Sequence, residues 1–259
     1  KTVVINTDGT VGIVTVTATN TPTAGDAVTF DSDNSTYSDV GYDPDNGKVV
    51  VAYADGGNSE KGTAIVGTVS GSSISFGTPV VFESGGTAYP SVAYDTTNNK
   101  IVIAYQDDSD SDRSKAIVGT VSDTSISFGS AALVDSDITN QTNQVAAYDS
   151  ANNRVVVAYS DVTNSKGKVA VGTVSGTEIT FGTPVEFFSA ETQFIALTYD
   201  STNEKVVIAW RQAGSSPYAG KAVVGTVSGT SISFGTIADF EAGATTQIGA
   251  TYDSTNGKV

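Results

Sequence analysis

The fold is decided by Tyr94-Asp95-Thr96-Thr97-Asn98-Asn99-Lys100-Ile101-Val102-Ile103-Ala104-Tyr105, a stretch that the chain of 259 residues repeats along its length. Further copies run at Tyr42–Tyr53, Tyr148–Tyr159 and Tyr199–Trp210, and another begins at Tyr252. The first tyrosines of successive copies lie 51 to 54 residues apart. A period of this size, built from short apolar runs, is typical of stacked supersecondary units. The sequence therefore predicts one repeat domain.

Each repeat contains four segments with the pattern of β-strands. In the best-formed copy they are Ser91–Tyr94, Lys100–Tyr105, Ala116–Val121 and Ser125–Phe128. The turn between the first two is rich in Asp and Asn, which tolerate positive φ and hydrogen-bond nearby backbone amides. The second strand is apolar on both faces, which indicates burial between two layers, whereas the fourth alternates and predicts a solvent-facing edge. We therefore expect an all-β fold, a β-propeller of four-stranded antiparallel blades.

The repeats divide the single domain, residues 1–259, into blades. We expect a divergent partial blade at 1–35, full repeats at 36–87, 88–141, 142–192 and 193–245, and the start of a closing blade at 246–259. Lys1 precedes a strand as Lys258 does, so a fifth blade shared between the two termini would close the ring and remove its exposed edges. The alternatives are a larger ring with blades outside this segment and an open stack. The ends of the chain are those expected of a mature or excised piece of a longer protein.

Composition excludes several classes of function. The formal net charge is −15, so a phosphate backbone would be repelled and nucleic acid is not an expected partner. The chain has no Cys, Met or His, which excludes disulfides, thiolate chemistry, imidazole bases and the usual zinc and copper ligands. No run of 18 apolar residues occurs, so no membrane insertion is expected. The acidic surface fits an extracellular location.

Blade connectivity sorts the loops onto two faces. The turns after strands one and three are nearly identical between repeats and share one face, whereas the loops after strands two and four vary and share the other. The variable loops are 54–62, 106–115, 160–168 and 211–221 after strand two, and 31–36, 83–88, 135–142, 189–193 and 241–246 after strand four. Loops on a rigid scaffold commonly carry binding sites, so we expect binding on the variable face. The alternative is simple drift of solvent-exposed loops.

Alternate carboxylates in one variable loop form a candidate metal site. Asp108, Asp110 and Asp112 could project to one side and offer hard oxygen ligands to Ca²⁺. A calcium loop counted from Asp108 would require Gly and Glu at its sixth and twelfth positions, where this chain has Arg113 and Gly119. The alternative is a hydrated acidic loop. No cofactor is expected, and calcium is the one that the sequence leaves open.

Aromatic residues near the variable face form a candidate ligand site. Tyr37, Tyr89 and Phe194 each lie five residues before the repeated tyrosine and could stack on a sugar, although Asn143 and Gln247 interrupt this ring. The variable loop 211–221 adds two more candidates, Arg211 and Tyr218. The single tryptophan, Trp210, takes the place of a repeated tyrosine, and we interpret it as a core residue.

Catalysis is not expected. Propeller hydrolases need convergent acids near the channel, but the repeats place Ser, Val, Ala and Gly at the equivalent of Asp39. A sialidase-like site would need several arginines around one anion, and the chain has only Arg113, Arg154 and Arg211. The repeated aspartates of the Asp-x-x-Asn turns are interpreted as turn-forming residues. We therefore expect a protein that is not an enzyme.

The recurring run Val-Gly-Thr-Val-Ser-Gly-Thr-Ser-Ile-Ser-Phe-Gly-Thr-Pro-Val occurs, with variations, at 66–80, 118–132, 171–185 and 224–237. Followed by Tyr-Asp-Ser-Thr-Asn-x-Lys-Val-Val-Ile-Ala-Tyr, it resembles tandem repeats of structural or tail-appendage proteins of marine phages, especially those that infect cyanobacteria. Similar arrays occur in bacterial surface proteins. The resemblance covers about Ala27–Val259 and carries over no functional residues.

The resemblance implies a structural or interaction module of a virion appendage or an extracellular surface fibre. Its implied partners are other virion or surface-structure proteins and host cell-surface glycans, and its implied location is extracellular or on the virion surface. Two alternatives remain open at this stage. One is a carbohydrate-binding propeller, with or without calcium, and the other is a glycoside hydrolase.

Overall fold

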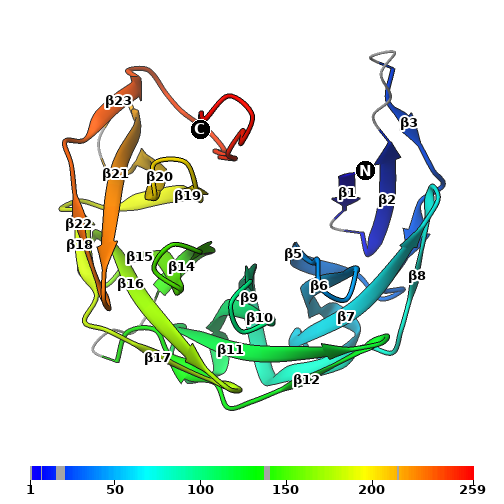
Figure 1. Ribbon diagram of the computed structural model, residues 1–259. Coiled ribbons are helices and arrows are strands. Elements are labelled where there is room, and N and C mark those ends of the chain that lie inside the picture. The colour runs from blue at the N-terminus through cyan, green and yellow to red at the C-terminus, as the bar shows by residue number, and fades with distance from the viewer. Residues whose placement is uncertain (1, 7, 16–20, 137–140, 215) are drawn as a thin grey trace.

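The protein is an open ring of antiparallel β-sheets (Figure 1). The computed structural model describes residues 2–6, 8–15, 21–136, 141–214 and 216–259. Within these residues the only helical elements are two single 3₁₀ turns, η1 (Gly56–Asn58) and η2 (Asp108–Asp110). The expected all-β architecture is therefore confirmed.

The repeat seen in sequence is a four-stranded blade. In blade C the strands are β9 (Val80–Asp95), β10 (Lys100–Asp107), β11 (Arg113–Ser122) and β12 (Ser125–Phe128), in the sheet order β12-β11-β10-β9. A short strand, β13 (Ala132–Leu133), extends the outer edge by pairing with β11. Strand β9 belongs to two blades. Its first part pairs with β7 as an outer strand of blade B, and its second part pairs with β10 as the inner strand of blade C.

Blades B, D and E follow the same plan, whereas blade A as described has no counterpart of the inner strand β9. Blade A consists of β1 (Thr2–Ile5), β2 (Thr10–Thr15), β3 (Thr23–Ala24) and β4 (Val28–Thr29). Blade B has β5 (Ser35–Asp43), β6 (Lys48–Asp55), β7 (Lys61–Ser70) and β8 (Ser73–Phe76). Blade D has β14 (Gln141–Asp149), β15 (Arg154–Asp161), β16 (Lys166–Ser175), β17 (Glu178–Phe181) and β18 (Val185–Phe188). Blade E has β19 (Thr192–Asp200), β20 (Lys205–Gln212), β21 (Gly220–Ser228), β22 (Ser231–Phe234) and β23 (Ala238–Glu241). The first strands β5, β9, β14 and β19 lie nearest the centre (Figure 1).

The core lies between neighbouring blades. Second strands are buried on both faces, as their unbroken apolar sequence predicts: Val102 and Ile103 are both fully buried and belong to different interblade clusters. Burying each such side chain contributes about 1.5–3 kcal/mol relative to exposure. The blades are therefore held together mainly by the apolar faces that they cover on one another.

In blades B to E, a buried aromatic side chain lies two residues before the end of the second strand. The Tyr159 hydroxyl donates to the Asp135 carboxylate of the preceding blade at 2.7 Å. Trp210 occupies the same place in blade E and is fully buried, but it packs on Phe188, with ring centroids 5.2 Å apart. An apolar pair thus replaces a polar pair at this interface, which confirms the expected core role of Trp210.

The two ends of the chain do not meet. Among the described residues no strand pairs with the free edge of β1, and the N- and C-terminal segments lie on either side of an opening in the ring (Figure 1). Asp253 instead forms an antiparallel bridge with Lys258. In the expected closed ring, Lys1 would take the place of Lys258 opposite Asp253. The expected fifth blade shared between the termini is therefore not found in this structure, because the C-terminal segment forms its own hairpin beside blade E. The number of blades stays a prediction.

Candidate functional site

Each inner strand carries a β-bulge where it enters the ring. The strand register shifts at Tyr37, Tyr89, Asn143 and Phe194, and the backbone φ angles of these residues are 47°, 49°, 54° and 51°. Gln247 has a φ of 49° at the matching place in the C-terminal segment. Left-handed backbone is unfavourable for bulky residues, so these positions are strained, and bulges commonly re-aim a side chain beside a functional site.

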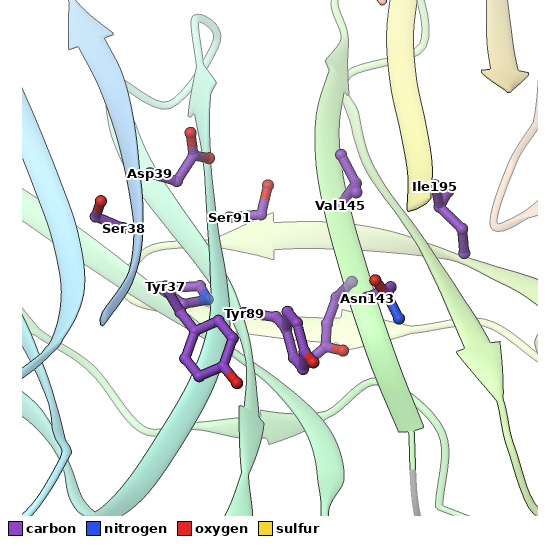
Figure 2. A pocket seen from close by; sticks show the side chains of 10 residues that line it. Tyr37, Ser38, Asp39, Tyr89, Ser91, Asn143, Val145 and Ile195 are labelled. Carbon is purple, nitrogen blue, oxygen red and sulfur yellow. The ribbon is translucent and has the colours of Figure 1, made fainter. Parts of the chain in front are cut away.

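Two of the predicted aromatic residues meet at the mouth of the central channel. The rings of Tyr37 and Tyr89 lie 4.5 Å apart between centroids and are tilted by 49°, and 47% of Tyr37 is exposed. They line a cavity of about 320 Å³ (Figure 2). Its other lining residues come from the inner strands of blades B to E: Ser38, Asp39, Pro90, Ser91, Asn143, Gln144, Val145 and Ile195.

Asp39 is the single carboxylate among the residues that line this cavity. Its carboxylate accepts hydrogen bonds from the backbone amides of Val92 at 2.7 Å and Val40 at 2.8 Å. Burial nevertheless raises the pKa of Asp39, because it disfavours the charged form more than these hydrogen bonds favour it. Figure 2 shows Asp39 and Ser91 on adjacent strands above the two tyrosine rings. The group offers a hydrogen-bond acceptor to a ligand in the cavity.

The cavity also contains a polar residue that the sequence did not single out. Gln144 follows the bulge residue Asn143 and is only 3% exposed. Neither atom of its side-chain amide has a hydrogen-bond partner within the described part of the chain. Buried polar groups are almost always hydrogen-bonded, so an amide with no partner needs an explanation. The bulge at Asn143 interrupts the alternation of β14, so the sequence pattern predicts neither the direction of this side chain nor its unpaired amide.

The remaining three candidates form a second cluster. The Arg211 guanidinium lies 4.6 Å from the Phe194 ring centroid and 5.5 Å from that of Tyr218, and it donates a hydrogen bond to Gln193. Tyr218 is 43% exposed. A cavity of about 340 Å³ adjoins this cluster and is lined by Phe194 together with Tyr89 and Asn143. The structure thus places the five candidate ligand residues in two neighbouring groups.

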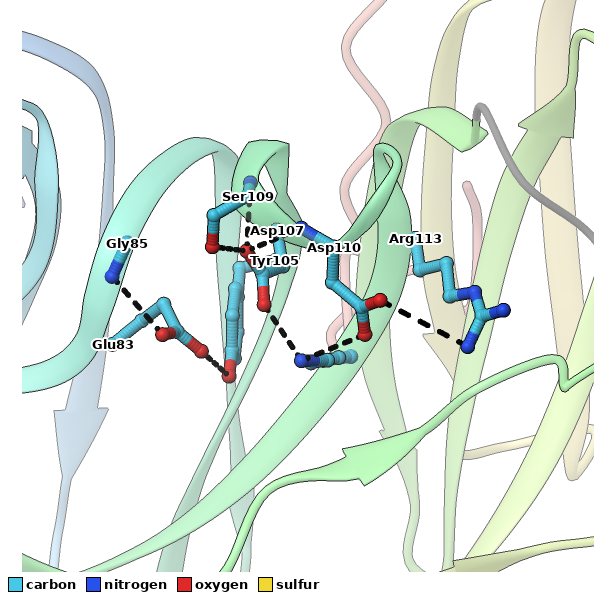
Figure 3. A network of polar contacts seen from close by, with 8 residues as sticks. Glu83, Gly85, Tyr105, Asp107, Ser109, Asp110 and Arg113 are labelled. Atoms are coloured by element: carbon cyan, nitrogen blue, oxygen red, sulfur yellow. Dashed lines mark hydrogen bonds and ion pairs between the residues drawn. The ribbon is translucent and has the colours of Figure 1, made fainter.

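The three candidate metal ligands are engaged by different partners. Asp110 lies 3.0 Å from the Lys115 ammonium group and 3.9 Å from Arg113 (Figure 3). Asp108 and Asp112 instead accept from the Gln106 amide at 2.9 and 3.2 Å. Across the described residues, no group of three or more acidic side chains is placed to hold a metal ion. The structure therefore does not gather these aspartates around a calcium position.

The preceding aspartate organises this loop. Asp107 accepts from the backbone amides of Ser109 and Asp110 and from Lys115 Nζ at 2.6 Å (Figure 3). Although burial opposes the charged form, the hydrogen bond from Lys115 and those from Ser109 lower the pKa of Asp107. The loop is thus built around an ion pair.

The opposite face is fixed by repeated turns. Asp95 Oδ1 accepts from the backbone amides of Thr97 and Asn98 at 2.9 Å each, and Asn98 Nδ2 donates to Asp95 Oδ2 at 2.8 Å. The same contacts recur around Asp43, Asp149, Asp200 and Asp253. From Tyr94 onward, the repeated tyrosine ties its turn to the preceding one, as when the Tyr94 hydroxyl donates to Asp45 at 2.6 Å. These aspartates therefore form turns, as expected.

Comparisons with known proteins identify the architecture. No family model matches the chain, and no curated protein matches it. A crystal structure of a protein from Lactobacillus plantarum is similar, with a TM-score of 0.66, 13% identity, 92% of this chain covered and 66% of that chain covered. The exo-β-1,3-galactanase of Phanerochaete chrysosporium, solved with β-1,3-galactotriose, is similar with a TM-score of 0.54, 11% identity, 89% of this chain covered and 53% of that chain covered.

The chain thus spans about two thirds of the first of these proteins and about half of the second. At such low identity the likeness shows the fold alone. The described residues include no helix with the length and hydropathy needed to cross a membrane. Repeated four-stranded blades and propeller-like neighbours together identify the chain as an all-β protein of the β-propeller type.

Proposed function

We propose that the protein is a non-enzymatic attachment module of a virion appendage or an extracellular surface fibre. One observation carries the proposal: one face of the ring repeats the same hydrogen-bonded turn, whereas the other presents strained, exposed aromatic residues. Such a division suits a rigid spacer that binds through one side. Its partners are other proteins of the same particle or fibre.

The acid content of the channel mouth supports binding rather than hydrolysis. Glycosidases use a pair of carboxyl groups, one on each side of the scissile bond. Of the residues that line the 320 Å³ cavity, Asp39 alone carries a carboxyl group. The similarity to a galactanase concerns the fold, and it transfers no catalytic residue to this chain.

Mass spectrometry of purified extracellular particles tests the structural role. We expect the sequence to be found in a large polypeptide that sediments with virions or cell-surface fibres. Recovery only as a free secreted protein of about 26.4 kDa would contradict the proposal.

A second candidate, carbohydrate binding, is favoured by the exposed Tyr37–Tyr89 pair beside a cavity. Aromatic rings at such a position can stack on the apolar face of a sugar. On a glycan array that includes host polysaccharides, we expect binding that falls when Tyr37, Tyr89 or Phe194 is replaced by Ala. Tyr94→Phe is the matched control, since it removes only the hydroxyl that contacts Asp45 on the opposite face. Unchanged binding by the three alanine variants would contradict this candidate.

We also propose that the ring is completed by the C-terminal segment on β1. Among the described residues no strand pairs with the inner edge of β1, and a cavity of about 610 Å³ beside β1 is lined in part by Val3, Val40 and Tyr42. The repeat register would pair Ala250 with Val4, as Val92 pairs with Ile103 in blade C. The chain has no native cysteine, so Val4→Cys with Ala250→Cys should form one disulfide within a monomer. A disulfide-linked dimer, or free thiols under oxidising conditions, would contradict five-blade closure.

A further inference from the structure

The unpaired amide of Gln144 indicates what the channel-mouth cavity accepts. The side chain is held in place by burial, yet both its Nε2 donor and its Oε1 acceptor lack a partner among the described residues. Leaving such a group unsatisfied in a folded protein is unfavourable. A ligand in the cavity that Gln144 lines would supply the missing hydrogen bonds.

The chemistry of that ligand follows from what an amide can do. One primary amide donates from nitrogen and accepts at oxygen, so it is matched by a group that offers an acceptor and a donor side by side. Two vicinal hydroxyls of a sugar ring offer this pair. Asp39 can accept from a further hydroxyl, and Tyr37 and Tyr89 supply an aromatic surface in the same cavity.

Charge selects between neutral and acidic sugars. Asp39 is the single charged residue that lines the cavity, and the whole chain carries a formal charge of −15. A uronate or a sulfate ester in this cavity would face a carboxylate with no lining cation to offset it. The volume of about 320 Å³ is at the lower end of the range for small-molecule sites, about 300–1,000 Å³, which suits a single saccharide unit.

We propose that this cavity binds one neutral pyranose unit of a glycan, with the Gln144 amide bonded to two vicinal hydroxyls beside the Tyr37–Tyr89 pair. The inference rests on the proposed carbohydrate-binding role, and it adds the class of sugar and a residue that determines specificity. Within the described part of the chain Gln144 makes no side-chain hydrogen bond, so its replacement by Leu removes the sugar contact and relieves an unsatisfied buried group.

The test is a ligand-observed NMR titration of the whole chain with four methyl glycosides. The neutral probes are methyl β-galactopyranoside, methyl β-glucopyranoside and methyl α-mannopyranoside, and the acidic probe is methyl β-glucuronoside. We expect at least one neutral glycoside to bind, and the glucuronoside to bind at least tenfold more weakly than the glucoside, from which it differs by one carboxylate. Gln144→Leu should weaken binding at least tenfold while leaving the melting temperature unchanged or higher.

The matched control is Gln106→Leu. Gln106 is also a buried amide next to the variable face, but it donates to Asp108 and Asp112 and does not line the cavity. We expect this variant to lose stability and to keep its affinity for the glycoside.

The outcomes separate the inference from the function on which it rests. Glucuronoside binding as tight as that of the tightest-binding neutral glycoside overturns the inference without the use of any variant. Array binding that is lost in Tyr89→Ala but retained in Gln144→Leu also overturns it, while carbohydrate binding stands. If neither the glycosides nor any glycan on the array binds, the carbohydrate function fails together with the inference.

Discussion

The two faces of the ring are built from the same strands, but they differ in how completely their polar groups are satisfied. On the turn face, the carboxylate of Asp95 accepts three hydrogen bonds from its own turn. On the loop face, Tyr89 holds a left-handed backbone, and the buried amide of Gln144 and the Nε of Arg211 have no partner among the described residues. The turn face therefore satisfies its polar groups locally, whereas the loop face contains strained backbone and buried polar atoms without partners among the described residues.

This difference shows which local structures a repeat can copy without losing stability. A turn that satisfies its own backbone can be copied into every repeat without loss, as the five Asp-x-x-Asn turns show. Strain and unsatisfied polar groups cost stability, and proteins tolerate them chiefly at functional sites. The predictions below are ordered from the largest expected effect to the smallest.

Breaking the turn face should reduce stability without altering ligand binding. Asp95→Ala removes a buried carboxylate that accepts from the Thr97 and Asn98 amides, and we expect a loss of about 2–3 kcal/mol in the free energy of unfolding. Denaturant titration measures this loss. The control Thr96→Ala alters an exposed neighbour and should change stability by less than about 0.5 kcal/mol. Equal effects of the two substitutions would show that the turn contributes little.

Releasing the strain on the loop face should not reduce the free energy of unfolding, unlike the loss of a turn aspartate. Tyr37→Gly places glycine at a φ of 47°, and we expect stability to be unchanged or to rise by up to about 1 kcal/mol. Tyr42→Gly provides the control, since Tyr42 is exposed in the same strand without a left-handed backbone, and we expect it to cost about 0.5–1 kcal/mol. A greater loss at Tyr37 than at Tyr42 would mean that the bulge is not strained.

The two faces should also respond oppositely to pH. Burial raises the pKa of Asp39 above its value in the unfolded chain, which is about 3.8. Protonated Asp39 therefore favours folding at pH values below about 3.8. This contribution to stability is lost as the pH rises through the pKa of Asp39 in the folded protein. Hydrogen bonds from Asn203 lower the pKa of Asp200, so its contribution is present above that range and is lost as pH falls. Relative to wild type, Asp39→Asn should therefore gain stability from pH 3 to pH 6, and Asp200→Asn should lose it. Parallel trends in thermal unfolding would contradict this assignment.

Chelation should have the smallest effect. Asp110 is already paired with Lys115, and Asp108 and Asp112 accept from Gln106. We expect EDTA to leave both the melting temperature and glycoside binding unchanged. A drop in either that calcium alone reverses would restore these aspartates as a cation site.

The features that could be predicted from sequence are those that each repeat encodes locally. Strand periodicity gave the four strands of the blade, and the repeated Asp-x-x-Asn pattern gave the turns. The burial of Trp210 followed from its alignment with the repeated tyrosines. The variable loops correctly indicated the face on which the strained aromatic residues lie.

The features that could not be predicted depend on neighbours distant in the sequence. The bulge at Tyr37 is a shift in the pairing of β5 with β6. It therefore depends on both strands and cannot be read from residues 36–39 alone. Asp107 and Asp110 of the acidic loop pair with Lys115 of the next strand, whereas the other two aspartates of the loop accept from Gln106. Whether the Gln144 amide is satisfied depends on residues that surround the channel from other blades.

Hydrogen exchange measured with and without the tightest-binding neutral glycoside tests most directly the claim that the loop face binds and the turn face only supports it. We predict that bound sugar slows exchange of backbone amides near residues 36–40, 88–92 and 143–146, around the bulges that line the cavity. The five Asp-x-x-Asn turns should exchange at the same rate in both states. Protection that appears at the turns, or that is absent from the bulges at saturating sugar, would contradict the account.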